Sequence, residues 1–135
     1  MDKKLIHCCG CDQKVNARLT NGEEIYPHKS DLYLLPFWKC DVCNNFVGCH
    51  HKTKNRTQPL GNIPTPELRE YRKKIHSILD PLWKSGAYTR KEIYERISKR
   101  IGWKYHTAKI KTVEEAEKII AIVKGYQRKS IWRTL

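Results

Sequence analysis

The sequence lacks any long apolar run. No segment of its 135 residues approaches the roughly 18 consecutive apolar residues that cross a bilayer, so we expect no membrane partner. Residues 1–6 also lack the apolar core of a signal peptide, and we expect the chain to remain in the cytoplasm. In that reducing compartment, its six cysteines are expected to bind metal rather than to form disulfides.

Acidic residues are scarce as well. The chain has 14 Asp and Glu against 27 Lys and Arg, which gives a net charge of +13. Residues 55–135 carry +11 of this (19 basic minus 8 acidic), whereas residues 1–54 carry only +2 (8 basic minus 6 acidic). Positive charge concentrated in one half of a chain favours a polyanionic partner, most simply DNA or RNA.

Two cysteine pairs stand out in the nearly neutral half, Cys8-x2-Cys11 and Cys40-x2-Cys43. This spacing is typical of a four-cysteine zinc site, because each pair can direct two thiolates at one ion. We predict one structural Zn²⁺ with these four ligands. Four thiolates leave no open coordination position for catalysis, and metal binding supplies folding energy that so short a segment lacks.

Other potential ligands lie close to these pairs. Cys9 could replace a neighbouring cysteine, although it would form a poorer chelate with Cys11. Cys49 is expected to pack as a small apolar residue. The alternative is a second metal site formed by Cys49, His50 and His51, which is disfavoured because adjacent ligands rarely converge on one ion.

The segment between the cysteine pairs carries strand and turn signals. Residues 15–19 alternate apolar and polar side chains, as in a half-buried strand. Asn21-Gly22 is the signal for a two-residue hairpin turn, and residues 25–26 are expected to begin the return strand. A further strand over residues 32–38 leads into the second pair. These signals predict a zinc ribbon over residues 1–52.

Residues 53–66 are polar and rich in proline, and we interpret them as a linker. A first helix is then expected to begin at Thr65-Pro66, with Thr65 as its N-cap. Its apolar stripe runs to Leu82. Pro81 should end or kink this helix, because proline removes a helical hydrogen bond.

Two further helices are predicted by their capping signals. Thr89-x-x-Glu92 begins one helix, which Gly102 ends, and Thr112-x-x-Glu115 begins another, which Gly125 ends. The last ten residues, 126–135, suggest a short separate helix. The predicted fold is therefore a small α+β protein. It has an N-terminal four-cysteine zinc ribbon, made of a β-hairpin plus a strand, packed with a C-terminal three-helix part. Residues 67–135 form this basic helical domain.

Several short motifs carry a resemblance to a known family. They are Val47-Gly48-Cys49-His50, Pro59-Leu60-Gly61 and Asp80-Pro81-Leu82-Trp83. With the two cysteine pairs, they resemble a zinc-finger-containing domain family of unknown function found in phage and bacterial proteins. The similarity covers residues 8 to about 124. It implies a phage or prophage origin and a location in the host cytoplasm, and it implies no activity.

A polar group on the first predicted helix is a possible functional cluster. His76 and Asp80 are one turn apart and can hydrogen-bond, and Arg69 lies in the same arc. With His50, this group would supply the side chains of a hydrolytic centre. No nucleophile or oxyanion-hole motif accompanies it, so we interpret His76 and Asp80 as a brace before Pro81 and expect no enzymatic activity.

Basic and aromatic residues interleave most densely between Arg90 and Arg133. Planar side chains can stack on bases while cations follow phosphates, which is typical of single-strand binding. Alternatively, Trp103 and Trp132 belong to the core, because a tryptophan side chain buries a large apolar area. Tyr126 lies in the same basic stretch. The candidate nucleic-acid contacts are Arg96, Lys99, Arg100, Trp103, Lys104, Lys109, Lys111, Arg128, Lys129 and Arg133.

The sequence therefore predicts a zinc-binding accessory protein that binds nucleic acid non-enzymatically and without sequence specificity. One alternative is a protein-interaction module that binds or inhibits a host enzyme or complex through the nearly neutral zinc ribbon. A His/Asp nuclease is the third hypothesis, and it requires His50, His76 and Asp80 to lie within reach of one another.

Overall fold

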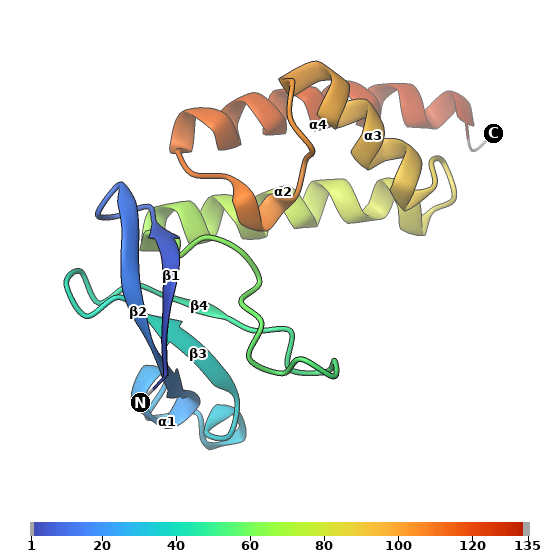
Figure 1. Cartoon of the computed structure of the whole chain (residues 1–135). Helices are drawn as coiled ribbons and strands as arrows, with labels where there is room; N and C mark the ends of the chain where they lie inside the picture. The colour runs from blue at the N-terminus through green and yellow to red at the C-terminus, as the bar shows by residue number, and fades with distance from the viewer. Residues whose placement is uncertain (1, 134–135) are drawn as a thin grey trace. The chain divides into compact units, whose positions relative to one another are not determined.

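The computed structural model describes residues 2–133 and divides the chain into two compact units, Met1–Pro66 and Glu67–Leu135 (Figure 1). We call them the N-terminal unit and the helical unit. Each has its own buried core, so each is described by itself.

The N-terminal unit is built on a four-stranded antiparallel sheet with the strand order β1-β2-β3-β4. The strands are β1 (Lys3–Cys8), β2 (Gln13–Asn21), β3 (Pro36–Lys39) and β4 (Phe46–Gly48). A tight connection at the first cysteine pair joins β1 to β2, and another at the second cysteine pair joins β3 to β4. Since neighbouring strands run in opposite directions, both connections lie at the same end of the sheet. The topology itself therefore brings the two cysteine pairs together.

The hairpin predicted at Asn21-Gly22 is wrong. Asn21 instead caps the short helix α1 (Gly22–Ile25), and its side chain accepts a hydrogen bond of 3.2 Å from the Glu24 backbone N–H. Gly22 is buried, and a Cβ there would lie 1.7 Å from the carbonyl oxygen of Leu32. The glycine thus permits a close backbone approach rather than a hairpin turn. The real hairpin pairs β2 with β1, a strand that the sequence analysis does not predict.

The strand predicted over residues 32–38 is shorter and shifted. Residues Ser30–Leu32 form the 3₁₀ helix η1, and the strand itself is β3. Trp38 on β3 is only 4% exposed, and its indole N–H donates a hydrogen bond of 2.7 Å to the Thr57 carbonyl. This residue belongs to the core of the unit, together with Ile6, Cys8, Ala17, Cys40, Val47, Cys49 and Ile63.

Residues 53–66, interpreted from composition as a linker, take part in this core. Ile63 is fully buried. Its N–H donates to the His7 carbonyl at 2.9 Å, and its own carbonyl accepts from the Cys9 N–H at 2.8 Å. Leu60 and Ile63 are the only aliphatic residues in this polar stretch and give no periodic signal, so composition alone could not show that this segment packs against β1.

The helical unit contains α2 (Pro66–Lys84), α3 (Arg90–Ile101) and α4 (Val113–Arg133), with the 3₁₀ helix η2 (Thr107–Lys109) between the last two. The threonines of both predicted capping boxes act as N-caps. Thr89 Oγ1 accepts from the Glu92 N–H at 3.0 Å, and Thr112 Oγ1 accepts from the Glu115 N–H at 3.1 Å. Gly102 ends α3 in the left-handed region, at φ +85°.

The helix end predicted at Gly125 is wrong, and of the two effects expected of Pro81, an end or a kink, the end does not occur. α2 continues past Pro81 to Lys84, and α4 continues past Gly125 to Arg133. A glycine in a helix costs about 1 kcal/mol, and that cost is offset because Val123 and Tyr126 on either side of Gly125 are buried. Residues 126–133 are therefore the final turns of α4, while 134–135 lie outside the described residues.

Polar contacts connect α2 to the rest of the helical unit. The buried Arg72 donates a hydrogen bond of 2.6 Å from Nη2 to the Ile110 carbonyl. The Tyr71 hydroxyl donates to Glu117 on α4 at 3.1 Å. Between residues 2 and 133, no helix is both long enough and apolar enough to cross a membrane.

Candidate metal centre and basic surface

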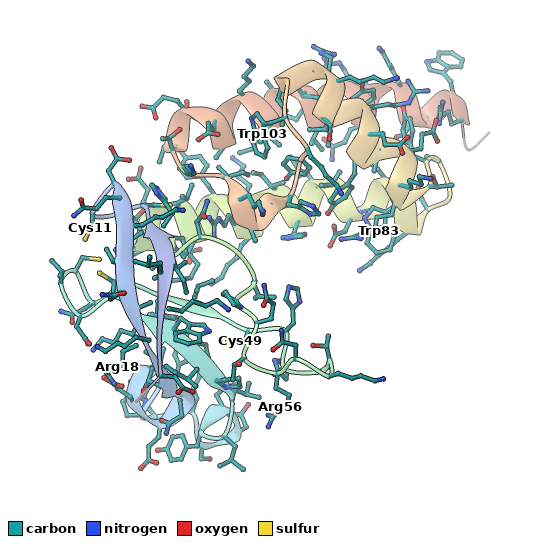
Figure 2. The ribbon with its side chains drawn as sticks, viewed as in Figure 1. Cys11, Arg18, Cys49, Arg56, Trp83 and Trp103 are labelled. Atoms are coloured by element: carbon teal, nitrogen blue, oxygen red, sulfur yellow. The ribbon has the colours of Figure 1, made fainter. Side chains whose placement is uncertain are left out.

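The four paired cysteines converge at one end of the sheet. Cys8 is the last residue of β1 and Cys40 directly follows β3, whereas Cys11 and Cys43 lie in the turns after them; Figure 2 shows Cys11 in the β1–β2 turn. The Sγ atoms of Cys8 and Cys43 are 3.3 Å apart, those of Cys11 and Cys40 are 3.8 Å apart, and all four lie within 4.8 Å of one another. Thiolates arranged tetrahedrally at about 2.3 Å from Zn²⁺ would be about 3.8 Å apart. The cluster therefore fits a single structural zinc ion.

The two cysteine turns share one backbone conformation. Asp12 follows Cys11 with φ +53°, and Asn44 follows Cys43 with φ +65°. Aspartate and asparagine tolerate this left-handed region better than other residues that carry a side chain. The repeated conformation shows that the sequence builds the same metal-binding turn twice.

Backbone donors support the first cysteine of each pair. The N–H groups of Gly10 and Cys11 donate to the sulfur of Cys8, and those of the corresponding residues in the second turn donate to Cys40. Such N–H···S contacts stabilise a thiolate and orient it toward a metal. Gly10 lets the Asn45 side chain approach this turn closely, because a Cβ there would lie 2.6 Å from Asn45 Nδ2 and would make that side chain shift.

Burial of the sulfurs favours a cation at this cluster. Cys8 is 0% exposed and Cys40 is 1% exposed. Burial raises the pKa of the Cys8 thiol far above its usual range, because a lone thiolate there would be poorly solvated. When zinc is bound, its positive charge would hold the four sulfurs as thiolates. All four ligands are protein thiolates, which is typical of a site that stabilises the fold.

The remaining cysteines and histidines of this unit form no second centre. In the part of the chain that the structure describes, the only cluster of metal-ligating side chains is the four-cysteine set. Cys9 is outside it. Cys49 is 5% exposed, and burial raises the pKa of its thiol to about 11, so it stays protonated at neutral pH and packs as a small apolar residue, as predicted.

A small antiparallel sheet whose two hairpin turns direct four cysteines at one metal defines a zinc finger, here followed by a helical unit. The chain belongs to the zinc-finger-containing domain family DUF3268, whose model matches residues 4–129. This match confirms the resemblance found in the sequence. No curated protein and no solved structure matches the chain significantly.

A charge network links the sheet to the second cysteine turn. Arg18 on β2 pairs with Glu24 and with Asp41, each at 2.9 Å, and Lys39 on β3 pairs with Glu24 at 3.1 Å. Thr20 also donates a hydrogen bond to Glu24. The Arg18 guanidinium lowers the pKa of Glu24 to about 2 and holds the pKa of Asp41 below its usual range. Because Asp41 lies between Cys40 and Cys43, the network supports the metal-binding turn.

Glu24 is expected to make the stability of the N-terminal unit depend on pH. Its folded pKa of about 2 lies below the ordinary value of 4.5, so its contribution is complete above about pH 4.5 and is lost as the pH falls toward 2. The side chain is 36% exposed, which limits the effect to about 1 kcal/mol. Urea denaturation of Glu24→Gln should show this loss at pH 7 and a smaller one near pH 3.

The matched control for this prediction is Glu23→Gln, which changes an exposed neighbouring carboxylate. Comparing each variant with the wild type at the same pH cancels the general loss of zinc affinity in acid. An equal destabilisation by Glu23→Gln at pH 7 would mean that the network around Arg18 contributes nothing specific.

The possible functional cluster is divided between the two units. His76 Nδ1 lies 3.3 Å from Asp80 Oδ1, one helical turn further along α2. Arg69 is on the same helix, whereas His50 is an exposed residue of the N-terminal unit. The His76 and Asp80 side chains are 49% and 26% exposed, and their contact acts as a local brace before Pro81.

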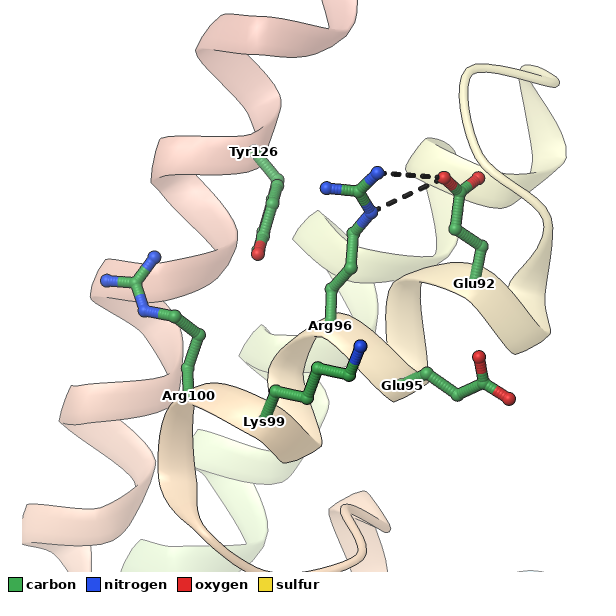
Figure 3. A pocket seen from close by; sticks show the side chains of 6 residues that line it. All are labelled: Glu92, Glu95, Arg96, Lys99, Arg100 and Tyr126. Atoms are coloured by element: carbon green, nitrogen blue, oxygen red, sulfur yellow. Dashed lines mark hydrogen bonds and ion pairs between the residues drawn. The ribbon is translucent and has the colours of Figure 1, made fainter.

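The candidate nucleic-acid contacts fall on three parts of the helical unit. Arg96, Lys99 and Arg100 lie on α3 and line a pocket with Tyr126 of α4 (Figure 3). Lys104, Lys109 and Lys111 are exposed in the connection from α3 to α4, and Arg128, Lys129 and Arg133 are on α4. Partial burial and the charges of Lys104, Lys109 and Arg90 lower the pKa of His106, which reports the positive potential of this region.

Not all of these candidate residues are equally available to contact nucleic acid. Arg133 donates to the Ala87 carbonyl at 3.0 Å and to Glu92 at 3.2 Å, and its guanidinium lies 4.0 Å from the centre of the Tyr88 ring. It therefore stabilises the helical unit. Trp103 is half-buried, with its ring 6.0 Å from that of Tyr105. Trp132 is 80% exposed, so its alternative assignment to the core is wrong.

Proposed function

We propose that the protein binds nucleic acid without catalysing a reaction, that the helical unit provides the contacts and that zinc stabilises the N-terminal unit. The observation that carries this proposal is the set of exposed cations on the helical unit for which neither an ion pair nor a contact with an aromatic ring is found among residues 2–133. They are Lys74, Lys91, Lys99, Arg100, Lys104, Lys111, Lys118, Lys124 and Arg128.

The acidic residues of the unit leave this charge unneutralised. Glu92 is shared by Arg96 and Arg133, Asp80 contacts His76, and Glu117 accepts from Tyr71. Several carboxylates are therefore engaged with partners inside the unit. The remaining positive field favours the approach of a polyanion and the release of its counterions.

Direct binding tests the proposal. Labelled 20-mers of single-stranded DNA, single-stranded RNA and duplex DNA would be titrated with the zinc-bound full chain at about 50 mM salt, where electrostatic binding is strong. We expect fluorescence anisotropy to show binding in the micromolar range or tighter. Lys104→Gln/Lys111→Gln should weaken it by about tenfold, because two phosphate contacts are lost.

The charge-matched control removes two exposed lysines of the N-terminal unit, as Lys52→Gln/Lys54→Gln, and should leave the affinity within about twofold of the wild type. A chain that binds none of the three nucleic acids at low salt would rule out the proposed function.

One observation favours a protein partner as the second candidate function. Residues 1–54 carry a net charge of only +2, which suits contact with a protein better than contact with a polyanion, and Val42, in the second cysteine turn, is 82% exposed and can be substituted to probe this face. If the N-terminal unit binds a protein, Val42→Asp should abolish a nuclease-resistant complex while leaving zinc content and nucleic-acid binding unchanged. A complex that survives Val42→Asp would exclude this turn as the docking site.

A further inference from the structure

We propose that the pocket between α3 and α4 binds a phosphate group of a nucleic-acid chain, with the Tyr126 hydroxyl and the cations of Arg96, Lys99 and Arg100 as its donors. This inference rests on the proposed function and assigns to it a specific site. Without such a site, the basic residues would act only as a diffuse positive surface.

The pocket is a half-open groove of about 480 Å³ whose walls come from two helices (Figure 3). This volume is within the range of small-ligand sites and exceeds that of a phosphate alone, so the attached sugar also has room. The lining residues are Glu92, Glu95, Arg96, Lys99, Arg100 and Tyr126.

Tyr126 is the residue that distinguishes this pocket from a solvated helix face. It is only 7% exposed, and its ring packs edge-on against Tyr88 with the ring centres 5.7 Å apart. Its hydroxyl makes no hydrogen bond to any residue from 2 to 133 and points into the space between Arg96 and Arg100 (Figure 3). The ring is buried but the hydroxyl itself reaches solvent at the pocket, so it can exchange a water molecule for an oxygen of a bound ligand, and that oxygen is the partner that we assign.

Two of the three cations are free to contact that ligand. Lys99 and Arg100 are exposed at the pocket, and neither has an ion-pair partner in the described part of the chain. Guanidinium and ammonium groups are the usual donors to phosphate oxygens. A phosphate can accept hydrogen bonds from several donors at once, whereas a carboxylate has only two oxygens to share among the four donors here.

Arg96 can join the site at little electrostatic cost. It pairs with Glu92 at 3.1 Å, but Glu92 has a second partner in Arg133 at 3.2 Å. If Arg96 turns toward a bound phosphate, Glu92 therefore keeps a positive neighbour. Glu95 adds a second carboxylate to the lining, so the pocket carries three cations and two anions and is suited to one phosphate group rather than to several.

The test compares pocket variants with matched controls in the zinc-bound full chain. Tyr126→Phe removes only the unpartnered hydroxyl, and Tyr94→Phe on α3 is its control. Lys99→Gln/Arg100→Gln removes two pocket charges, and Lys118→Gln/Lys124→Gln removes the same charge from exposed positions of α4. We expect about a fivefold loss of affinity for a 12-mer in Tyr126→Phe, and a loss in the pocket double variant at least fivefold larger than in the control pair.

Two additional measurements give independent readouts of the site. Inorganic phosphate should shift the NMR resonances of Arg96 and Tyr126 in the wild type and not in Lys99→Gln/Arg100→Gln. A 12-mer with a 5′-phosphate that binds more tightly than the unphosphorylated 12-mer, only when the pocket is intact, would identify a terminal phosphate as the ligand. Equal binding of the two 12-mers, still dependent on the pocket, would identify an internal phosphodiester.

The inference and the proposed function fail in different ways. Equal losses in the pocket and control double variants, or wild-type affinity in Tyr126→Phe, would overturn the pocket as a phosphate site while leaving nucleic-acid binding in place. A wild-type chain that binds no 12-mer would instead overturn the proposed function. Thermal denaturation of each variant would show that the fold is retained.

Discussion

Replacing Cys8 by serine is expected to release zinc and to unfold the N-terminal unit. The substitution removes one of four thiolates from a cluster whose sulfurs all lie within 4.8 Å of one another. The core of this unit is small, and two of its members, Cys8 and Cys40, are themselves metal ligands. Structural zinc contributes about 10 kcal/mol or more to the folding of comparable domains, which is similar to the whole stability of a small protein.

Trp38 gives a direct readout of this unfolding. Its indole N–H is hydrogen-bonded to the Thr57 carbonyl at 2.7 Å, and its ring belongs to the core around the metal ligands. We expect its dispersed indole NMR signal to disappear in Cys8→Ser and in the wild type treated with a chelator. The indole signals of Trp83, Trp103 and Trp132 should persist, because the helical unit has its own core.

Cys9→Ser is the control for this prediction. It changes an adjacent cysteine that is outside the four-cysteine cluster, so one zinc ion per chain should remain bound and the Trp38 signal should be retained. Zinc content would be measured by atomic absorption on the purified variants. Full zinc occupancy in Cys8→Ser, or loss of zinc in Cys9→Ser, would show that the ligand set assigned here is incorrect.

The features that the sequence predicted correctly depend on residues close together in the chain. A Cys-x2-Cys turn or a Thr-x-x-Glu capping box is complete within four residues, and both cysteine pairs and both caps occur as expected. Pro81 and Gly125 were local signals too, but buried neighbours outweighed them. A local signal therefore predicts a cap more reliably than a helix end, because packing decides how far a helix continues.

The features that the sequence did not predict depend on pairing between distant segments. Asn21-Gly22 suggested a hairpin, yet β2 pairs with β1 because the first cysteine turn folds those two strands together. Ile63 packs in the core where backbone hydrogen bonds with His7 and Cys9 hold its segment beside β1. Likewise, nothing in the sequence placed the Tyr126 hydroxyl beside Arg96, since that pocket requires α4 to lie against α3.

Nucleic-acid affinity is expected to fall about a thousandfold when salt is raised from about 50 to about 200 mM. Neutralising six phosphates of duplex DNA gives a slope of about −5 in a plot of log affinity against log salt concentration. The helical unit offers enough exposed cations for this number of contacts, on α3, on α4 and on the connection between them. Anisotropy titrations at four or five salt concentrations would measure the slope.

The slope also tells which cations touch phosphates. Each phosphate contact that is removed reduces its magnitude by about one, so Lys99→Gln/Arg100→Gln should change it from about −5 to about −3, whereas Lys52→Gln/Lys54→Gln should leave it unchanged. An affinity that does not depend on salt would contradict electrostatic binding by the helical unit, because counterion release accompanies every phosphate contact made by lysine or arginine. In that case the exposed cations would serve solubility, and a protein partner of the nearly neutral N-terminal unit would better explain the structure.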